Sequence, residues 1–341
     1  MTLAPTGPLA LLPSGPAAAD GPAVSVVIPL YNEDENLDDA MVELLRVLDH
    51  LDRSAEVILV DDGSRDGTAA RARFWQTADP RVGVVYFRRN FGQTAAIDAG
   101  FRASRGSIVI LMDGDMQNDP ADIPKLLEAV AQGYDVVSGW RKDRKDKLLL
   151  RKFPSKVANR LISRVTGTDL HDYGCTLKAY DRDIVSHLNL YGELHRFIPA
   201  LASQVGANVI EIPVNHRPRT RGKSKYGISR TVRVVLDLIT VMFLLRYLAR
   251  PMQYFGRLGL AAMGVGVAVT TWLVAEKLLL GHGLAERPLF VMGLASMGLG
   301  VEFVCFGLLG ELITRTYHEN GNRSPYVVRE TQLPTAWASG S

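Results

Sequence analysis

Two long uncharged segments near the carboxyl terminus constrain the fold of this chain more than any other feature. Residues 258–275 carry no charge, and residues 288–309 carry only Glu302. A helix needs about 20 apolar residues to cross a bilayer, and the glycines that recur in both segments favour close helix packing in lipid. We therefore predict two membrane-spanning helices, at about 257–277 and 288–311, rather than two core helices of a soluble domain.

Basic residues lie close to both outer ends of this pair of segments. They are Arg246, Arg250 and Arg257 before the first segment, and Arg315, Arg323 and Arg329 after the second. The connecting loop is short and balanced in charge. The positive-inside rule then places both outer ends in the cytoplasm, so we expect a multi-pass protein of the cytoplasmic (inner) membrane.

The composition divides the chain into five regions. We expect a disordered Pro/Ala/Gly-rich segment at 1–22, a cytoplasmic domain at 23–227, an amphipathic juxtamembrane helix at 228–250, a transmembrane hairpin at 251–314 and a cytoplasmic tail at 315–341. The two cysteines, Cys175 and Cys305, fit a reducing compartment and indicate neither a disulfide framework nor a zinc site. A net charge of +3 is too small to indicate a nucleic-acid partner. Two local basic clusters, 141–156 and 217–225, could face phosphates, lipid headgroups or only solvent.

Strand and helix patterns alternate through the first half of the chain. Strands are predicted at 24–29, 56–60, 82–87, 108–112 and 135–138, and helices at 33–50, 68–78, 94–103 and 122–132. Further along, helices are predicted at 148–166 and 228–248, and extended segments at 175–180 and 209–213. The β-α alternation predicts an α/β domain with a mostly parallel sheet covered by helices on both faces.

Asp113 and Asp115 directly follow a buried apolar run, residues 107–112. Ligands of open α/β sheets bind at the carboxyl ends of the strands. Two carboxylates this close repel each other unless a cation lies between them, and hard oxygen ligands favour Mg²⁺ or Mn²⁺ completed by substrate phosphates. The pair thus indicates a metal–diphosphate site, although a polar turn would show the same two residues.

Other strand ends carry polar side chains that suit a nucleoside. Tyr31 and Glu33 follow the first predicted strand, and Asp62 follows the second. An aromatic ring can stack on a base, and carboxylates can accept hydrogen bonds from base and ribose. Asp66 and Thr68 favour a plain turn and helix cap. The chain has no GxGxxG after the first strand, and its Gly-Lys-Ser at 222–224 lacks the remainder of a P-loop.

These strand-end motifs together resemble family 2 glycosyltransferases of the GT-A fold. The resemblance is carried by VVIPLYNE (26–33), VDDGSRDGT (60–68), RRNFG (88–92) and DGDMQNDP (113–120). DYGC (172–175) and RTRGKSKY (219–226) are similar to the polyprenyl-phosphate branch, which includes dolichyl-phosphate mannose synthase and bacterial undecaprenyl-phosphate glucosyl-type transferases. The tail from Gly310 to Glu330 also resembles the bacterial members, so the resemblance covers about residues 24–330. Gly114, which separates Asp113 from Asp115, stands where the family more often has Ala.

The resemblance implies a role for particular residues. The nucleotide sugar would be held by Pro29, Tyr31, Glu33, Val60, Asp62, Asp113, Gly114, Arg219 and Lys225. The metal, Mg²⁺ or Mn²⁺, would be positioned by Asp113, Asp115 and Gln117, and the lipid phosphate by Arg141, Arg151 and Ser155. Asp115, Arg141 and Asp172 are the predicted catalytic residues, with Asp172 shaping the sugar pocket or serving only the structure.

The expected reaction moves a sugar from a nucleoside diphosphate to a polyprenyl phosphate at the cytoplasmic membrane face. A phosphate acceptor is largely dianionic at neutral pH and needs no general base, so we expect one displacement with inversion. UDP-glucose is the favoured donor, with GDP-mannose as the alternative. A membrane-anchored nucleotide-sugar-binding scaffold remains the alternative of another class, whereas a processive polysaccharide synthase should have more spans and a QxxRW motif. Glu302 could join a contact in a homo-oligomer.

Overall fold

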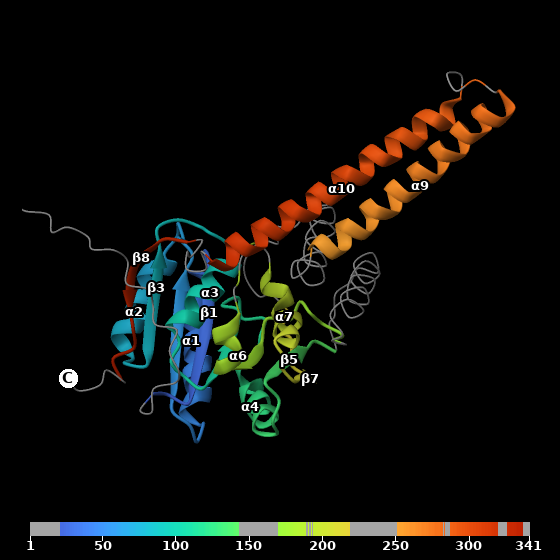
Figure 1. Cartoon of the computed structure of the whole chain (residues 1–341). Coiled ribbons are helices and arrows are strands. Elements are labelled where there is room, and N and C mark those ends of the chain that lie inside the picture. The colour runs from blue at the N-terminus through green and yellow to red at the C-terminus, as the bar shows by residue number, and fades with distance from the viewer. Residues whose placement is uncertain are drawn as a thin grey trace, which may run out of the picture. The chain divides into compact units, whose positions relative to one another are not determined.

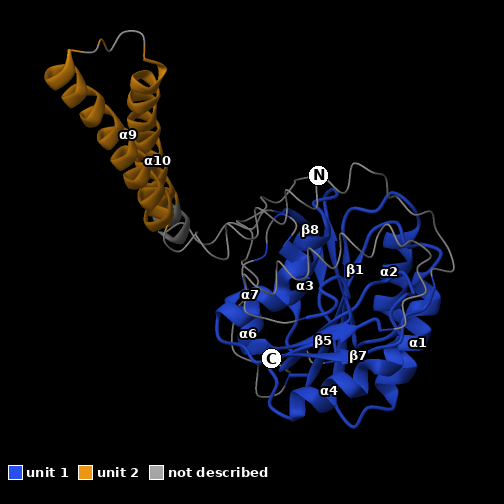
Figure 2. Cartoon of the chain, turned by 90° about the vertical axis from the view of Figure 1, so that its right-hand side faces the viewer, with its two compact units in different colours: residues 1–238, 324–341 blue, residues 239–323 orange. Residues whose placement is uncertain are grey.

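The computed structural model describes residues 21–142, 170–188, 190, 192, 194–218, 251–281, 283, 287–319 and 326–336. The chain divides into two compact units (Figure 2). One unit contains residues 1–238 together with 324–341, and the other contains residues 239–323. The last part of the chain therefore belongs to the same unit as the first.

A mixed, mostly parallel sheet forms the centre of the larger unit (Figure 1). Over the described residues its strands are β1 (Val24–Leu30), β2 (Ala55–Asp61), β3 (Val82–Phe87), β4 (Ile108–Leu111), β5 (Val136–Trp140), β6 (Lys178–Asp181), β7 (Val209–Pro213) and β8 (Val328–Gln332). Their order across the sheet is β7-β5-β6-β4-β1-β2-β3-β8. The pairs β1–β2, β2–β3, β1–β4 and β5–β7 are parallel, whereas β6 is antiparallel to both β4 and β5, and β8 is antiparallel to β3. Because β6 is antiparallel to both of its neighbours, β5 and β7 run the same way as β1 to β4.

Helices cover both faces of this sheet. Hydrophobic side chains of α1 (Leu37–Asp49), α2 (Thr68–Ala78) and α4 (Ile123–Ala131) pack in one core, and those of α3 (Gln93–Ala103), α6 (Arg182–His187) and α7 (Ile198–Gln204) pack in the other. Short 3₁₀ helices, η1 (Pro120–Asp122) and η2 (Leu194–Phe197), precede α4 and α7. Along β2, Val57 and Leu59 enter the first core, and Ile58 and Val60 enter the second. This alternation explains why the central strands are apolar throughout, since both of their faces are buried.

The predicted α/β sheet with helices on both faces is confirmed, and each strand predicted from the β-α alternation is present. The first helix begins at Leu37 rather than at residue 33, because residues 33–36 form a turn in which the Asn36 N–H donates to the Glu33 carbonyl at 3.1 Å. Strand β8 was not predicted. The predicted helices 148–166 and 228–248 lie outside the described residues.

Two long helices form the smaller unit. They are α9 (Pro251–Leu280) and α10 (Pro288–Glu319). Both have a mean hydropathy of 1.9 over their most apolar windows, and only 17% and 11% of those windows are buried within the protein. A core helix of a soluble domain would be mostly buried, so the exposed apolar surface favours the prediction of membrane-spanning helices.

Glycines allow α9 and α10 to pack closely. A Cβ atom on Gly259 would lie 2.6 Å from the Gly300 carbonyl oxygen, and one on Gly266 would lie 2.6 Å from the Gly293 carbonyl oxygen. Because Gly259 and Gly300 face each other, the position of Glu302 along the helical pair is also defined. Glu302 lies beside the turn of α9 that contains Arg257. Glu302 is thus nearer to the amino-terminal end of α9 than to its carboxyl-terminal end.

Two neighbouring glycines of α10 allow a matched test of this packing. We expect Gly300→Ala to lower the thermal unfolding temperature of the purified protein in detergent, because its new Cβ would lie 2.6 Å from a backbone oxygen of α9. Gly298→Ala should keep or raise that temperature, since a Cβ added to Gly298 would have no atom within 4 Å and alanine favours helix by about 1 kcal/mol. Equal unfolding temperatures for the two variants would contradict the close packing.

Candidate functional site

The carboxyl ends of β1, β2 and β4 meet at one edge of the sheet. Leu30 is paired in register with Asp61, and Val27 with Leu111, so the chain segments that follow these strands emerge side by side. Tyr31, Asp62 and Asp113 come just after the three strands. These three residues therefore lie at one edge of the sheet, where ligands of open α/β sheets bind.

A hollow of about 280 Å³ lies at this edge. Among the predicted residues it is lined by Pro29, Tyr31, Glu33, Asp62, Asp113, Gly114 and Asp115. It is also lined by Leu30, Asn90, Gly92, Gln93 and Ala96, to which the sequence analysis assigned no role. Val60 does not line the hollow, because its side chain is fully buried against the α3 face of the sheet.

Unusual backbone conformations occur at two of these strand ends. Asn32 has φ of 55° and Met116 has φ of 63°, and no other described residue except glycine has a positive φ. Asn32 is held by Ser64, whose Oγ accepts its N–H at 3.0 Å, and its own side chain accepts the Arg65 N–H at 2.9 Å. Left-handed conformations at non-glycine residues cost free energy and cluster at functional sites, so the two turns identify the same edge as the lining residues do.

Asp113 is a strongly perturbed carboxyl group of the hollow. Its Oδ1 accepts a hydrogen bond from Gln93 Nε2 at 2.9 Å, and its Oδ2 accepts one from the Thr176 hydroxyl. Burial and the negative charge of Asp115 raise the pKa of Asp113 to about 6, although Thr176 and the cations Lys178 and Arg141 act to lower it. A bound cation would relieve the repulsion between the two carboxylates.

The donor groups at this edge suit a hard divalent cation shared with a phosphate. No group of three or more His, Cys, Asp and Glu side chains that could hold a metal is found within the described ranges. Mg²⁺ is usually bound by only one or two carboxylates, with waters and substrate phosphates completing its shell. Asp113 and Asp115 provide that minimal set. Gln117 holds the Asp115 carboxylate through its backbone N–H, which donates to Asp115 Oδ1 at 3.2 Å.

Asp62 holds the loop that follows β3 against the hollow. Its carboxylate accepts hydrogen bonds from Asn90 Nδ2 at 2.9 Å, from the Phe91 N–H at 2.7 Å and from the Gly92 N–H at 2.9 Å. Burial raises the pKa of Asp62 to about 6, while the two backbone donors act to lower it. A carboxylate has about four lone-pair sites, so Asp62 can both hold this loop and accept a bond from a ligand.

Arg141 and Asp172 form a bidentate ion pair at the same edge. Arg141 follows β5, whose carboxyl end lies on the side of Asp113, and its Nε and a terminal nitrogen donate to the two oxygens of Asp172 at 2.6 and 2.8 Å. Burial alone would raise the pKa of Asp172, but the hydrogen bonds and charge of Arg141 outweigh it and lower the pKa. A guanidinium has five N–H donors, so Arg141 retains donors for a second anion.

Two further polar residues of the site lie in and beside β6. The Lys178 side chain is 2% exposed, and its ammonium donates to the carbonyl oxygens of Tyr173 and Cys175. It therefore holds the turn from which Thr176 donates to Asp113. Neither residue was predicted, although a lysine within the apolar run of 177–180 was a signal that its charge is used internally.

The segment after β7 is joined to the loop that carries Asp115. The Arg217 N–H donates to the Gln117 carbonyl at 3.0 Å, and Asn118 forms a bridge with His216. The predicted Arg219 lies two residues farther along the chain. Arg219 and Lys225, like Arg151 and Ser155, lie outside the described residues.

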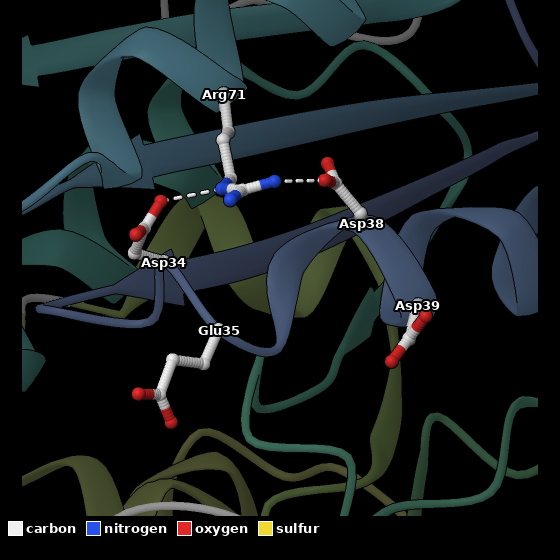
Figure 3. Close-up of a pocket in the computed structure, with 5 residues that line it drawn as sticks. All are labelled: Asp34, Glu35, Asp38, Asp39 and Arg71. Atoms are coloured by element: carbon white, nitrogen blue, oxygen red, sulfur yellow. Dashed lines mark hydrogen bonds and ion pairs between the residues drawn. The ribbon is translucent and has the colours of Figure 1, made fainter.

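A second hollow, of about 540 Å³, is lined almost entirely by carboxylates (Figure 3). Its residues are Asp34, Glu35, Asp38, Asp39 and Arg71, and Arg71 is paired with both Asp34 and Asp38. Arg71 is the only cation among the described residues of this lining and already bridges two acids, so these residues do not suit a negatively charged nucleotide.

Comparisons with known proteins identify relatives of the whole chain. The model of the family described as Glycosyl transferase family 2 matches residues 25–188. The dodecaprenyl-phosphate galacturonate synthase of Rhizobium johnstonii is 42% identical over 311 residues, which cover 90% of this chain and 92% of that protein. The undecaprenyl-phosphate 4-deoxy-4-formamido-L-arabinose transferase of Pseudomonas aeruginosa is 39% identical, with 92% and 93% covered.

Solved structures share the fold of the larger unit. Glucosyl-3-phosphoglycerate synthase from Mycobacterium tuberculosis, in complex with Mn²⁺, uridine diphosphate and glucosyl-3-phosphoglycerate, has a TM-score of 0.52 at 19% identity and covers 71% of this chain and 86% of its own. Mannosyl-3-phosphoglycerate synthase from Rubrobacter xylanophilus has a TM-score of 0.53 at 16% identity, with 65% and 74% covered. These likenesses establish the GT-A fold.

The raised pKa of Asp62 predicts a pH-dependent stability. Its pKa is about 6 in the folded protein against 3.8 in the unfolded reference, so its stabilising contribution is present below pH 3.8 and is lost as the pH rises through 6. We expect the thermal unfolding temperature of the wild type, relative to that of Asp62→Asn, to fall between about pH 4.5 and 7. A difference that stays constant over this range would contradict the raised pKa.

Proposed function

The chain belongs to glycosyl transferase family 2, and on that premise we propose that it transfers a sugar from a UDP-activated donor to a polyprenyl phosphate, with inversion and with a divalent cation. It is an enzyme of the same kind as its relatives, which are named as polyprenyl-phosphate sugar transferases and match it over nearly their whole length. The observation that carries the proposal is the hollow in which Asp113 and Asp115 lie with Tyr31, Glu33 and Asp62.

The donor would lie along the carboxyl edge of β1, β2 and β4. In this proposal the ring of Tyr31 and the carboxylates of Glu33 and Asp62 bind the nucleoside, while Asp113 and Asp115 would hold the cation that offsets the charge of the diphosphate. The first turn of α3 contributes Gln93 and Ala96 to the lining. Helix N-termini favour negative charge, which suits a diphosphate at this end of the hollow.

A divalent cation would offset the charge of the leaving nucleoside diphosphate when it is bound. Within the part of the chain that the structure describes, Asp113 and Asp115 have no third acidic or histidine ligand. Such a pair suits Mg²⁺ or Mn²⁺ that also binds substrate phosphates. Mn²⁺ with UDP in the glucosyl-3-phosphoglycerate synthase structure supports this choice, although that protein shares only the fold. Arg219 and Lys225 are proposed to add positive charge, because their segment begins at residues bonded to Gln117 and Asn118.

The acceptor would lie beside Arg141. The guanidinium is oriented by two bonds to Asp172, and its remaining donors can bind a phosphate oxygen of the lipid. Arg151 and Ser155 are proposed to contact the same phosphate. An oxygen of this phosphate forms a bond to the anomeric carbon as the bond to the nucleoside diphosphate breaks. No general base is required, because the second pKa of such a phosphate is near 6.

The place of β8 in the chain supports part of the proposed membrane orientation. Strand β8 follows α10 in sequence yet pairs with β3 in the larger unit. Both outer ends of the helical pair must therefore lie on the same side of a membrane that the pair crosses. With the arginines near those ends, we propose that the larger unit lies at the cytoplasmic face.

Replacement of Asp115 tests this function. We expect Asp115→Asn to lower transfer of radiolabelled sugar into the organic phase by roughly a hundredfold or more, because it removes charge at the diphosphate. The assay would use the protein in nanodiscs with undecaprenyl phosphate, Mn²⁺, and UDP-glucose or UDP-galacturonate.

Asp39→Asn is the matched control, because it removes one carboxylate from the acidic hollow and should leave transfer unchanged. Full activity of Asp115→Asn would contradict the metal–diphosphate site. A wild type that moves no sugar to the lipid from any UDP- or GDP-sugar donor would contradict the function itself.

A further inference from the structure

Residues 88–93, here called the 88–93 loop, connect β3 to α3 and include Gln93, the first residue of α3. Three of these residues line the hollow: Asn90, Gly92 and Gln93. On its inner side, Asn90, Phe91 and Gly92 are bonded to Asp62. Gln93 is bonded to Asp113. The loop is therefore bonded both to Asp62, at the predicted nucleoside end of the hollow, and to Asp113, at the predicted diphosphate end.

On its other side, the 88–93 loop and the preceding Phe87 contact Tyr326 and Val327. The Arg88 N–H donates to the Val327 carbonyl at 3.2 Å. The ring of Tyr326 stacks on Phe87 with centroids 4.9 Å apart, and the ring of Phe91 packs edge-on against Phe87 with centroids 5.7 Å apart. Strand β8, which begins at the next residue, Val328, forms the edge of the sheet next to β3 (Figure 1).

A buried hydrogen bond ties the same tyrosine to α3. The Tyr326 hydroxyl donates to Asp98 Oδ2 at 2.9 Å, and Arg102 Nε donates to the same oxygen at 2.7 Å. The tyrosine is 5% exposed and Asp98 is 3% exposed. Because α3 begins with Gln93 and also contributes Ala96 to the hollow, Tyr326 contacts both the strand end that leads into the loop and the helix that forms one side of the hollow.

We propose that residues 326–327, which return to the sheet after the two long helices, position the 88–93 loop for binding the nucleotide donor. This inference rests on the proposed donor site. Covering the sheet edge requires only the strand pairing of β8, whereas Tyr326 lies before β8 and directs its hydroxyl to α3. Tyr326 is therefore a positioning residue that acts through Phe87, Asp98 and the loop, without touching the donor.

The test compares variants of the full-length protein in nanodiscs. Tyr326→Phe removes the bond to Asp98 but keeps the stacked ring, and Tyr326→Leu removes both. We expect each to raise the Kd for UDP with Mn²⁺ and the KM for the donor by roughly three- to tenfold, a range that corresponds to the net contribution of one ordinary hydrogen bond. The KM for undecaprenyl phosphate should stay unchanged. The control is Glu330→Gln, which breaks an exposed ion pair between β8 and Arg73 and should change neither constant.

The outcomes separate this inference from the proposed function. If Tyr326→Leu does not fold, Tyr326→Phe decides, since it keeps the packing area. UDP binding by Tyr326→Phe equal to that of the wild type would overturn the inference, as would an equal rise in the KM values of donor and lipid. A wild type that binds neither UDP nor GDP would instead overturn the proposed donor site.

Discussion

The repulsion between Asp113 and Asp115 at the end of a buried strand is the constraint on which the site depends. Burial and this repulsion raise the pKa of Asp113 to about 6, and the surrounding structure acts against them. Gln93 and Thr176 donate to its two oxygens, and Lys178 fixes the turn that carries Thr176. A cation with a bound diphosphate would complete this arrangement. In the proposed function, the remaining strand ends would bind the nucleoside and the acceptor at the same edge.

The parallel half of the fold could be predicted because each of its strands and helices is visible in the pattern of neighbouring residues. Apolar strands such as β1 and β2 alternate with amphipathic helices, and polar residues such as Asp62 and Asp113 stand where strands end. Strand β8 could not be predicted, because it is short and polar and pairs with a strand more than 240 residues earlier. Lys178 was missed for a related reason: its partners are backbone carbonyls of a turn, which no spacing of side chains reveals.

The two long helices are inserted in the sequence of the unit that contains the proposed donor site. Helices α9 and α10 are inserted between β7 and β8 of one sheet, so the chain leaves the larger unit and returns to it. The returning segment places Tyr326 against Phe87 and Asp98. One short stretch of chain thus connects the helical pair to the sheet beside the proposed donor hollow, and the proposed positioning of the 88–93 loop would give this stretch a role beyond closing the sheet.

Electron paramagnetic resonance of Mn²⁺ bound to the purified protein with UDP would show whether Asp113 and Asp115 hold a cation together with the diphosphate. We expect bound Mn²⁺ with hyperfine coupling to phosphorus of UDP, and loss of that signal in both Asp113→Asn and Asp115→Asn. Binding of UDP with unchanged affinity in the absence of any divalent cation, or an unaltered signal in both variants, would contradict a shared metal–diphosphate site at the end of β4.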